Sequence, residues 1–590
     1  MDSSMSSSGQ ALLLIRNPVR SPLILASGNL RNISPKKVEV GSQRKLATSI
    51  PAPPSSTNST VPQPIKIDGT VETRRMLLMA NVFRSVDELI HKYLDLPLRP
   101  SIDPEHVLSG NFAPVHELAP TECEVIRGSI PTWLDGAYIR NGPNPQFHPA
   151  GPYHLFEGDG MLHLIRISGG KAKLCSRYVQ THKYLAERAA GSPVIPNFYS
   201  SFNGIPAAAM RVILASARAL ACHYNPANGI GMANTGVARI GHGLYALGES
   251  DLPYAIRVTG DGDVETVGRF DFNGALSQSM TAHPKLDADT GEVFAFQYNA
   301  LHPFLTYFRI DPDGTKTHEV PISSLTRPSF FHDFAVTKKY AIFCDSQLGI
   351  NSFKKIIQGG PLVGADLSKV PRLGVLPRYA ADDSEMRWFD VPGFNMVHSV
   401  NAWDEEEANE IVLVAPNAQS IGHALERLDL VNPSIEKVRI NLKTGNISRN
   451  TISPSNLEFS AINPSYLGKK NTYAYAAIGD PLPKIKGMVK LDVTGDEEAV
   501  VGRRMYGEGC FGGEPCFVAR DPCDPDAKED DGCLVTYLHD ESTGESRFLV
   551  MDAKSANLEV LAELKLPQRV PYGFHGLFIR GSDLGQPQKN

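Results

Sequence analysis

Short apolar runs with the character of β-strands follow one another from about residue 110 to the end of the chain. Six clear examples cover residues 243–249, 292–298, 340–344, 410–415, 472–477 and 533–537. Turn sequences separate the runs, among them Asp311-Pro-Asp-Gly314, Thr444-Gly-Asn446, Thr494-Gly-Asp496 and Thr543-Gly-Glu545. Short strands divided by such turns are typical of an all-β protein.

The strand-rich part covers 480 residues (590 − 110), which is too long for a single β-sandwich. A β-propeller accommodates this length in seven blades of about 70 residues, each with four strands and long inserted loops. No clean sequence repeat marks the blades, so chain length and strand density alone indicate this architecture. We therefore expect residues 101–590 to form a single propeller domain.

Four of the 17 histidines lie in apolar or tight-turn contexts, where a solvated side chain is unexpected. They are His283 in Thr281-Ala-His-Pro-Lys285, His332 in Phe330-Phe-His-Asp-Phe334, His398 in Met396-Val-His-Ser-Val400 and His575 in Gly573-Phe-His-Gly-Leu577. Each one alone is more simply explained as a hydrogen-bonded structural residue, because no pair has the spacing of two ligands on one helix face. One histidine on the innermost strand of each of four blades would bring them together at the propeller axis. Four neutral imidazoles would hold a divalent iron, copper or zinc ion.

Three glutamates are candidate partners for these imidazoles. Glu249 ends the apolar run at 243–249, Glu458 lies in Asn456-Leu-Glu-Phe-Ser460, and Glu514 lies in Gly512-Gly-Glu-Pro-Cys516. A buried glutamate is costly unless it is paired, and the free N–H of a metal-bound imidazole commonly donates to a carboxylate. Taken singly, each glutamate is equally well explained as a surface or salt-bridged residue.

The chain resembles the carotenoid cleavage oxygenases from about residue 100 to its end. The resemblance rests on Tyr138-Ile-Arg-Asn-Gly-Pro-Asn-Pro145, Phe156-Glu-Gly-Asp-Gly-Met161, the four histidine contexts and the three glutamates in matching order. It implies a seven-bladed β-propeller with a helical dome over an axial metal site. It also implies one Fe(II) per chain, with His283, His332, His398 and His575 as ligands and with Glu249, Glu458 and Glu514 hydrogen-bonded to three of them.

Four imidazoles leave coordination positions on the iron open to O₂, and the implied reaction is oxidative cleavage of a carotenoid or apocarotenoid double bond. Residues 332–343 look most like the plastid type-four enzymes. Their resemblance favours cleavage at 9,10 (9′,10′), which gives C13 ionone-type ketones and an apocarotenal or dialdehyde. Cleavage at 7,8 (7′,8′) and cleavage of a 9-cis-epoxycarotenoid toward abscisic acid are alternatives. An iron-dependent isomerase, a non-catalytic carotenoid-binding propeller and a zinc hydrolase are the rival functional classes.

The first 50 residues differ from the rest of the chain. They hold seven Lys or Arg, two acidic residues and many serines, which is the composition of an organelle transit peptide, although a disordered tail has a similar one. A Pro/Ser/Thr-rich linker follows over residues 51–70. The net charge is −6 for the whole chain and +5 (7 − 2) for residues 1–50, so the remainder carries −11. This acidic body argues against a nucleic-acid partner, and the resemblance implies a plastid location, in the chloroplast or chromoplast, at plastoglobules.

No run of about 20 uncharged apolar residues is present that could span a bilayer. Two segments have the pattern of amphipathic helices that can lie on a membrane surface: residues 74–94, within an expected helical segment at 71–100, and residues 205–221. Arg211 and Arg218 share one face of the second helix. Packing against the domain is an equally good explanation of both patterns.

Other cysteines and histidines have simpler interpretations. None of the eight cysteines forms a CxxC pair, so we expect free thiols and no zinc site at Cys510, Cys516, Cys523 and Cys533. We expect His148, His154 and His163 to be structural, because they flank a Gly/Pro-rich loop. His302 either packs in the fold or lines the path of the substrate.

Overall fold

The structure, a computed structural model, describes residues 71–201, 203–299, 301–351, 361, 363–497 and 500–584. The chain divides into two units, Met1–Ile67 and Asp68–Asn590, and every described residue belongs to the second. The transit peptide expected over residues 1–50 and the linker expected over residues 51–70 lie outside the described residues.

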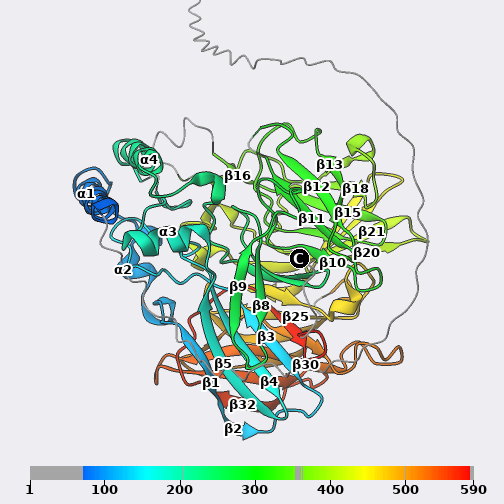
Figure 1. The fold of residues 1–590 in the computed structure, drawn as a ribbon. Helices are drawn as coiled ribbons and strands as arrows, with labels where there is room; N and C mark the ends of the chain where they lie inside the picture. The colour runs from blue at the N-terminus through cyan, green and yellow to red at the C-terminus, as the bar shows by residue number, and fades with distance from the viewer. Residues whose placement is uncertain are drawn as a thin grey trace, which may run out of the picture. The chain divides into compact units, whose positions relative to one another are not determined.

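Antiparallel strands dominate the regular secondary structure of the described chain, as the short apolar runs predict (Figure 1). The six runs singled out in the sequence are strands β7 (Gly243–Leu247), β11 (Val293–Tyr298), β15 (Tyr340–Asp345), β21 (Glu410–Asn417), β25 (Tyr473–Gly479) and β30 (Gly532–Asp540). The predicted turn at residues 311–314 is also present. Gly314 has a φ of +88°, which glycine adopts without steric cost, and its N–H donates to the carbonyl of Asp311.

Four sheets of four strands each follow one another along the chain. Their strands are β6 (Gly236–Ile240), β7, β8 (Tyr254–Val258) and β9 (Val264–Arg269); β10 (Lys285–Leu286), β11, β12 (Leu305–Ile310) and β13 (Lys316–Pro321); β14 (Phe334–Val336), β15, β18 (Arg372–Pro377) and β19 (Arg387–Asp390); and β20 (Asn401–Glu405), β21, β22 (Ser434–Asn441) and β23 (Ile447–Ser455). A separate hairpin joins β16 (Leu348–Ile350) to β17 (Val363–Ala365).

Two larger sheets combine strands from both ends of the described chain. The first has the order β1 (Leu118–Glu122), β5 (Lys171–Tyr178), β4 (Met161–Ser168), β3 (Gly136–Arg140) and β33 (Gly576–Arg580). The second contains β2 (Glu124–Gly128), β32 (Val560–Lys565), β31 (Glu545–Asp552), β30, β28 (Cys510–Gly512), β26 (Ile485–Asp492), β25 and β24 (Leu457–Ala461), with β27 (Val500–Met505) beside β26 and β29 (Cys516–Ala519) beside β30. Early and late strands therefore pair in both sheets, β3 with β33 and β2 with β32.

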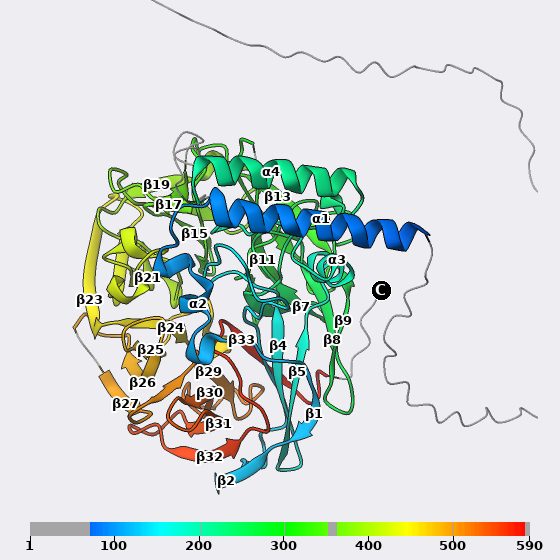
Figure 2. The same cartoon turned by 90° about the vertical axis from the view of Figure 1, so that its left-hand side faces the viewer.

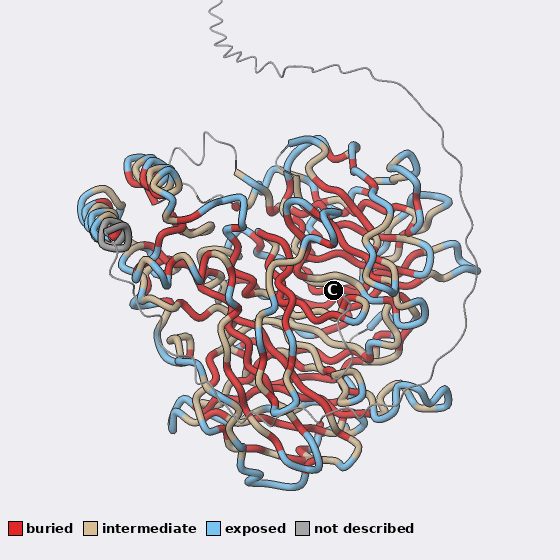
Figure 3. Tube along the Cα trace, in the orientation of Figure 1, coloured by how far each residue is buried: buried red, intermediate tan, exposed pale blue. Residues whose placement is uncertain are grey.

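Seven hydrophobic cores lie between groups of strands, where the buried stretches of the chain run side by side (Figure 3). The groups that share a core are β3–β5 with β7–β9; β6–β8 with β11–β12; β11–β13 with β14, β15 and β18; β14, β15, β18 and β19 with β20–β22; β20–β23 with β24–β26; β25–β26 with β29–β32; and β29–β32 with β3–β5. The last core returns to the strands that form the first, so the series closes on itself. Burial of apolar surface thus holds each group to two neighbours.

The longer helices lie together at one side of the sheets (Figure 2). They are α1 (Val71–Tyr93), α3 (His182–Ala190) and α4 (Ile205–Leu220), while α2 (Pro104–Val107) is a single turn. The helices expected over residues 74–94 and 205–221 are α1 and α4, and a small core around Ile90 and Leu214 joins them. Among the described helices, none combines the length and apolar character needed to cross a membrane.

Candidate metal centre

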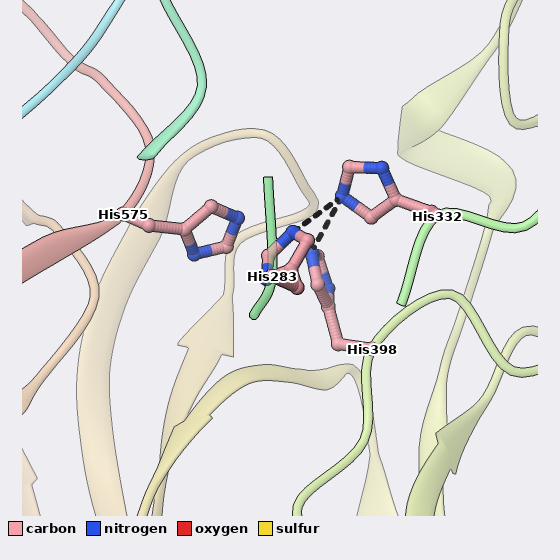
Figure 4. Close-up of side chains that lie close together, drawn as sticks. All are labelled: His283, His332, His398 and His575. Carbon is pink, nitrogen blue, oxygen red and sulfur yellow. Dashed lines mark hydrogen bonds between the residues drawn. The ribbon is translucent and has the colours of Figure 1, made fainter. Parts of the chain in front are cut away.

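Four histidine side chains meet at one point (Figure 4). One ring nitrogen from each of His283, His332, His398 and His575 lies within 4.8 Å of the others. The Nε2 atoms of His283 and His332 are 3.0 Å apart, and those of His332 and His398 are 3.1 Å apart. The ring of His575 lies 4.4 Å from that of His283, centroid to centroid. Across the described part of the chain, no other group of three or more potential metal ligands comes together in this way.

Each histidine lies in the loop that enters an edge strand of its sheet. His283 precedes β10 by two residues, and His332 precedes β14 by two. His398 lies three residues before β20, and His575 directly precedes β33. The expectation that the ligands lie on the strands themselves is therefore wrong by one to three residues. Side chains within a strand alternate between its two faces. On β14 and β20 both faces pack in cores, so the loop before each of these strands is where a ring can turn toward its counterparts.

Carboxylates contact the outer nitrogens of three of the rings, as the resemblance implies. His398 Nδ1 and Glu458 Oε2 are 2.9 Å apart, and His575 Nδ1 and Glu514 Oε1 are also 2.9 Å apart. Glu249 pairs with Nδ1 of His332. A carboxylate at Nδ1 favours the tautomer with the proton on that atom. The Nε2 lone pair of each of these rings is then free to bind a metal.

The protein environment lowers the pKa of His283 and raises that of His398. Burial and the three neighbouring imidazoles lower the pKa of His283 well below 6.5. Burial also acts to lower the pKa of His398, but the facing Glu458 carboxylate outweighs it and raises this pKa to about 9. Burial acts to raise the pKa of Glu458, yet the pKa lies below its usual range because His398 faces it. Glu458 is therefore ionised at neutral pH and supplies a negative charge behind its imidazole.

The donor set fits a divalent transition metal. The Nε2 atom of His332 lies 3.0 Å from that of His283 and 3.1 Å from that of His398, and in neutral rings the lone pairs on these atoms repel unless a cation or a proton lies between them. Imidazole nitrogens suit iron, copper and zinc. The three carboxylates behind the rings offset the charge of a dication held by neutral ligands.

Sequence reasoning missed a buried ion pair beside the histidines. Lys285 Nζ lies 2.7 Å from Asp333 Oδ1. Ser399 donates both its backbone N–H and its hydroxyl to Asp333 Oδ2, each at 2.8 Å. The sequence marks these polar residues only by their position near the histidines. Lys285 lies two residues after His283, Asp333 lies directly after His332, and Ser399 lies directly after His398.

The motif at residues 138–145 holds the fourth histidine through the backbone. The Asn141 N–H donates to the His575 carbonyl at 3.0 Å, and the Phe574 N–H donates to the Asn141 carbonyl at 2.9 Å. The Asn141 side-chain amide donates to the carbonyls of Ala233 and Gly236. Asn141 therefore ties the His575 loop to the start of β6 and the loop before it. In the motif at residues 156–161, the buried carboxylate of Glu157 serves a different segment, accepting from the N–H and hydroxyl of Ser200.

The remaining candidate residues lie outside the metal group. His154 bonds the carbonyl of Leu425 at 2.9 Å, His163 bonds the hydroxyl of Ser176 at 2.8 Å, and His302 bonds the carbonyl of Ser323 at 2.9 Å. His148 is not part of the group. All eight cysteines are free thiols in the structure, and the four toward the C-terminus form no metal-binding group within the described residues.

Comparison with known proteins identifies the family of the chain. Residues 112–580 match the family model described as retinal pigment epithelial membrane protein. The chain is 60% identical over 516 residues to the probable carotenoid cleavage dioxygenase 4, chloroplastic, of Arabidopsis thaliana, with 87% of each chain covered. It is 55% identical over 510 residues to the chloroplastic 9-cis-epoxycarotenoid dioxygenase NCED1 of Oryza sativa subsp. japonica, with 85% of this chain and 80% of that relative covered.

Solved structures share the fold. The crystal structure of lignostilbene dioxygenase from Pseudomonas brassicacearum matches with a TM-score of 0.70 and 25% sequence identity, over 82% of this chain and 100% of that chain. This likeness agrees with the mostly β architecture and its few helices. The chain belongs to the carotenoid cleavage oxygenase family and is an oxygenase enzyme of that family.

Proposed function

We propose that this enzyme is a non-haem Fe(II) dioxygenase that cleaves a carotenoid or apocarotenoid at the 9,10 (9′,10′) double bond. The observation that carries the proposal is the convergence of His283, His332, His398 and His575, three of them backed by carboxylates. One Fe(II) per chain would be held by the four Nε2 atoms. When bound, the iron supplies the electronic reactivity toward O₂ that the side chains lack.

The architecture that we propose is a seven-bladed propeller over residues 101–590. The ten-stranded sheet is joined in its middle by a single residue pair, Ile485 with Gly512, between β26 and β28. Division at that point makes two blades of it, which with the five-stranded sheet and the four four-stranded sheets gives seven. The closed series of seven shared cores supports this count, and α1, α3 and α4 would belong to the cap.

Aromatic rings beside the histidines suit an apolar polyene. The ring of Phe330 stacks on that of His332, with centroids 6.2 Å apart and planes 19° apart. The ring of Phe459 lies 5.5 Å from that of His398 and 5.7 Å from that of His575. Phe459 adopts a φ of +49°, an unusual conformation for this residue that the surrounding structure must impose. These rings would exclude water and hold a double bond near the iron, and the chain needs no catalytic acid or base because a polyene offers no proton to remove.

The first test is expression of the protein in bacteria that accumulate a carotenoid, with analysis of volatiles and pigments by mass spectrometry. C13 ionones that disappear in His398→Ala are the expected result. Products of cleavage at 7,8, or products of a 9-cis-epoxycarotenoid, would support dioxygenase activity but would change the proposed bond or substrate. Isomerised pigment without O₂ consumption, or purified protein without iron, would contradict the dioxygenase.

We also propose that the protein binds peripherally to a plastid lipid surface such as that of plastoglobules. Both α1 and α4 present exposed apolar side chains at helical spacing: Leu78, Val82, Leu89 and Tyr93 on α1, and Ile205, Val212, Ile213 and Leu220 on α4. Arg211 and Arg218 turn away from this surface and pair with Asp95 and Asp87. An apolar stripe of this kind fits burial in a lipid interface.

Flotation with lipid droplets tests the lipid-surface proposal. Val82→Ser, Leu89→Ser, Val212→Ser and Ile213→Ser, combined in one chain, should abolish flotation of a protein that otherwise rises with the droplets. Val500→Ser and Val501→Ser remove exposed valines on β27 and should leave flotation unchanged. Equal flotation of both variants and the wild type would contradict the proposal.

For the N-terminus we propose a plastid transit peptide at residues 1–50 and a linker at 51–70, supported by composition and by the chloroplastic relatives. Import of a reporter fused to residues 1–70 into isolated chloroplasts tests this assignment. A reporter that stays outside the organelle would contradict it.

A further inference from the structure

We infer that Lys285, Asp333 and Ser399 form a positioning triad that holds three of the four metal-binding loops at a fixed separation. The inference rests on the proposed metal centre and adds residues that act on it without contacting the metal. Each member follows a different histidine by one or two residues. Lys285 is the first residue of β10, and Asp333 and Ser399 lie in the loops that enter β14 and β20.

Asp333 is the centre of the triad. Its carboxylate accepts from Lys285 Nζ at 2.7 Å, from the backbone N–H of Phe334 at 2.7 Å, and from both the N–H and the hydroxyl of Ser399 at 2.8 Å. Lys285 Nζ also donates to the Ser399 hydroxyl at 3.1 Å, so all three side chains touch one another. Every loop therefore contacts both of the others through this one group.

Burial makes these contacts costly to break. Asp333 is 4% exposed, and the side chain of Lys285 is 12% exposed. A buried carboxylate that loses its partners retains the full penalty of leaving water, which is much larger than the net gain from the pair. The loops therefore cannot separate independently. Because Asp333 adjoins His332 and Ser399 adjoins His398, any movement of the triad is passed to those imidazoles.

A positioning role and a purely electrostatic role predict different results for the same pair of substitutions. If charge alone mattered, Asp333→Asn would leave the positive charge of Lys285 uncompensated near the metal site and weaken binding. Lys285→Met would leave an uncompensated carboxylate and strengthen binding. If the triad sets the separation of the loops, both substitutions weaken binding. The sign of the Lys285→Met effect therefore distinguishes the two.

The test is titration of the metal-free full-length protein with Co²⁺, followed by the visible absorption of the bound ion. We expect Asp333→Asn and Lys285→Met each to raise the Co²⁺ dissociation constant about 10- to 100-fold, the range seen when groups that orient metal ligands are removed. The double variant should bind about as weakly as either single variant, because one shared network is lost in all three. Tighter or unchanged binding by Lys285→Met would overturn the inference.

Asp345→Asn is the matched control. Asp345 is 2% exposed on β15, in the same sheet as β14, and pairs with Lys369 and with Arg372 Nε at 2.8 Å. It should lower stability as much as Asp333→Asn while leaving the Co²⁺ dissociation constant at the wild-type value. If Asp345→Asn weakens binding equally, general loosening of the fold explains the effect and the triad is overturned.

Ser399→Ala covers the case in which the charged variants do not fold. It removes one hydroxyl and keeps the backbone N–H bond to Asp333, so we expect about fivefold weaker Co²⁺ binding, the worth of one hydrogen bond. Unchanged binding by a folded Ser399→Ala would contradict the triad. A wild-type protein that binds no Co²⁺, Fe²⁺ or Zn²⁺ would overturn the metal centre itself, an outcome distinct from a wild type and variants that bind equally well.

Discussion

At the scale of single residues, the carboxylates behind the imidazoles are the groups whose replacement is most informative. Glu458→Gln keeps an oxygen that can accept from His398 Nδ1, but removes the charge that favours a cation-bound ring. We expect metal binding to weaken about 10- to 100-fold, measured by competition with a chelator of known affinity. Glu436→Gln is a control, since Glu436 is also buried and pairs with Arg449 at 2.7 Å. Equal binding by Glu458→Gln and the wild type would show that orientation alone matters.

His154 gives a pH-dependent contribution to stability that is separate from the metal. Its ring accepts from the Phe156 N–H and bonds the Leu425 carbonyl, and burial lowers its pKa from 6.5 to about 4. Between these values the unfolded chain binds a proton that the folded chain does not, so stability is full above pH 6.5 and falls as the pH decreases toward 4. By pH 5 the loss is about 2 kcal/mol.

Denaturant unfolding of the metal-free protein at pH 7.5 and pH 5 checks this contribution. His154→Gln should remove about 2 kcal/mol of the difference between the two pH values. His116→Gln, at an exposed position, should keep the wild-type difference. A His154→Gln protein as sensitive to acid as the wild type would contradict the assignment.

At the scale of elements, two ion pairs join α1 and the residues just after it to α4. Asp87 pairs with Arg218, and Asp95 pairs with Arg211. Arg218 has a side chain that is 5% exposed, pairs with Asp87 and lies over the ring of Phe83. We expect Arg218→Met to loosen α1 locally, because the Arg211–Asp95 pair just after α1 and a small apolar core are then left to hold it on α4. Limited proteolysis should then cut within α1 several-fold faster while the main melting transition stays unchanged. Arg257→Met breaks an exposed pair with Glu265 and should change neither measurement.

The elements also show which information the sequence carries locally. Strands such as β11 and β21 were predictable because their apolar runs and bounding turns lie within about ten residues. The loop placement of His283 and His575 was not, because the strand ends depend on pairing with distant partners. Arg211 and Arg218 were correctly placed on one face of α4, but their partners on and just after α1 could not be read from helix periodicity. The sequence predicts which face a residue shares, and tertiary packing decides what covers that face.

At the scale of the whole molecule, the metal site depends on the sheets meeting correctly. His283 and His575 are 292 residues apart (575 − 283), yet their ring centroids lie 4.4 Å from each other. Neither composition nor spacing predicts that approach. The apolar and tight-turn contexts marked the four histidines as candidates, and the family resemblance implied that they act as one ligand set. The sequence did not predict a role for Lys285, Asp333 and Ser399 for the same reason. Each is an ordinary polar residue, and only the folded chain brings the three together.

A metal bound by four loops from four sheets should stabilise the folded protein as a whole. A ligand that binds only the folded state contributes about 2.7 kcal/mol when its free concentration is 100 times its dissociation constant. We therefore expect chelation of the metal to lower the melting temperature of the main transition, and added Fe²⁺ or Co²⁺ to restore it in proportion to the logarithm of the metal concentration. His283→Ala should show a smaller rise in melting temperature at the same metal concentration, because the loss of one of four ligands raises the dissociation constant of the metal. A wild type that melts identically with and without metal would contradict the metal site, because an ion that binds only the folded state must raise the melting temperature.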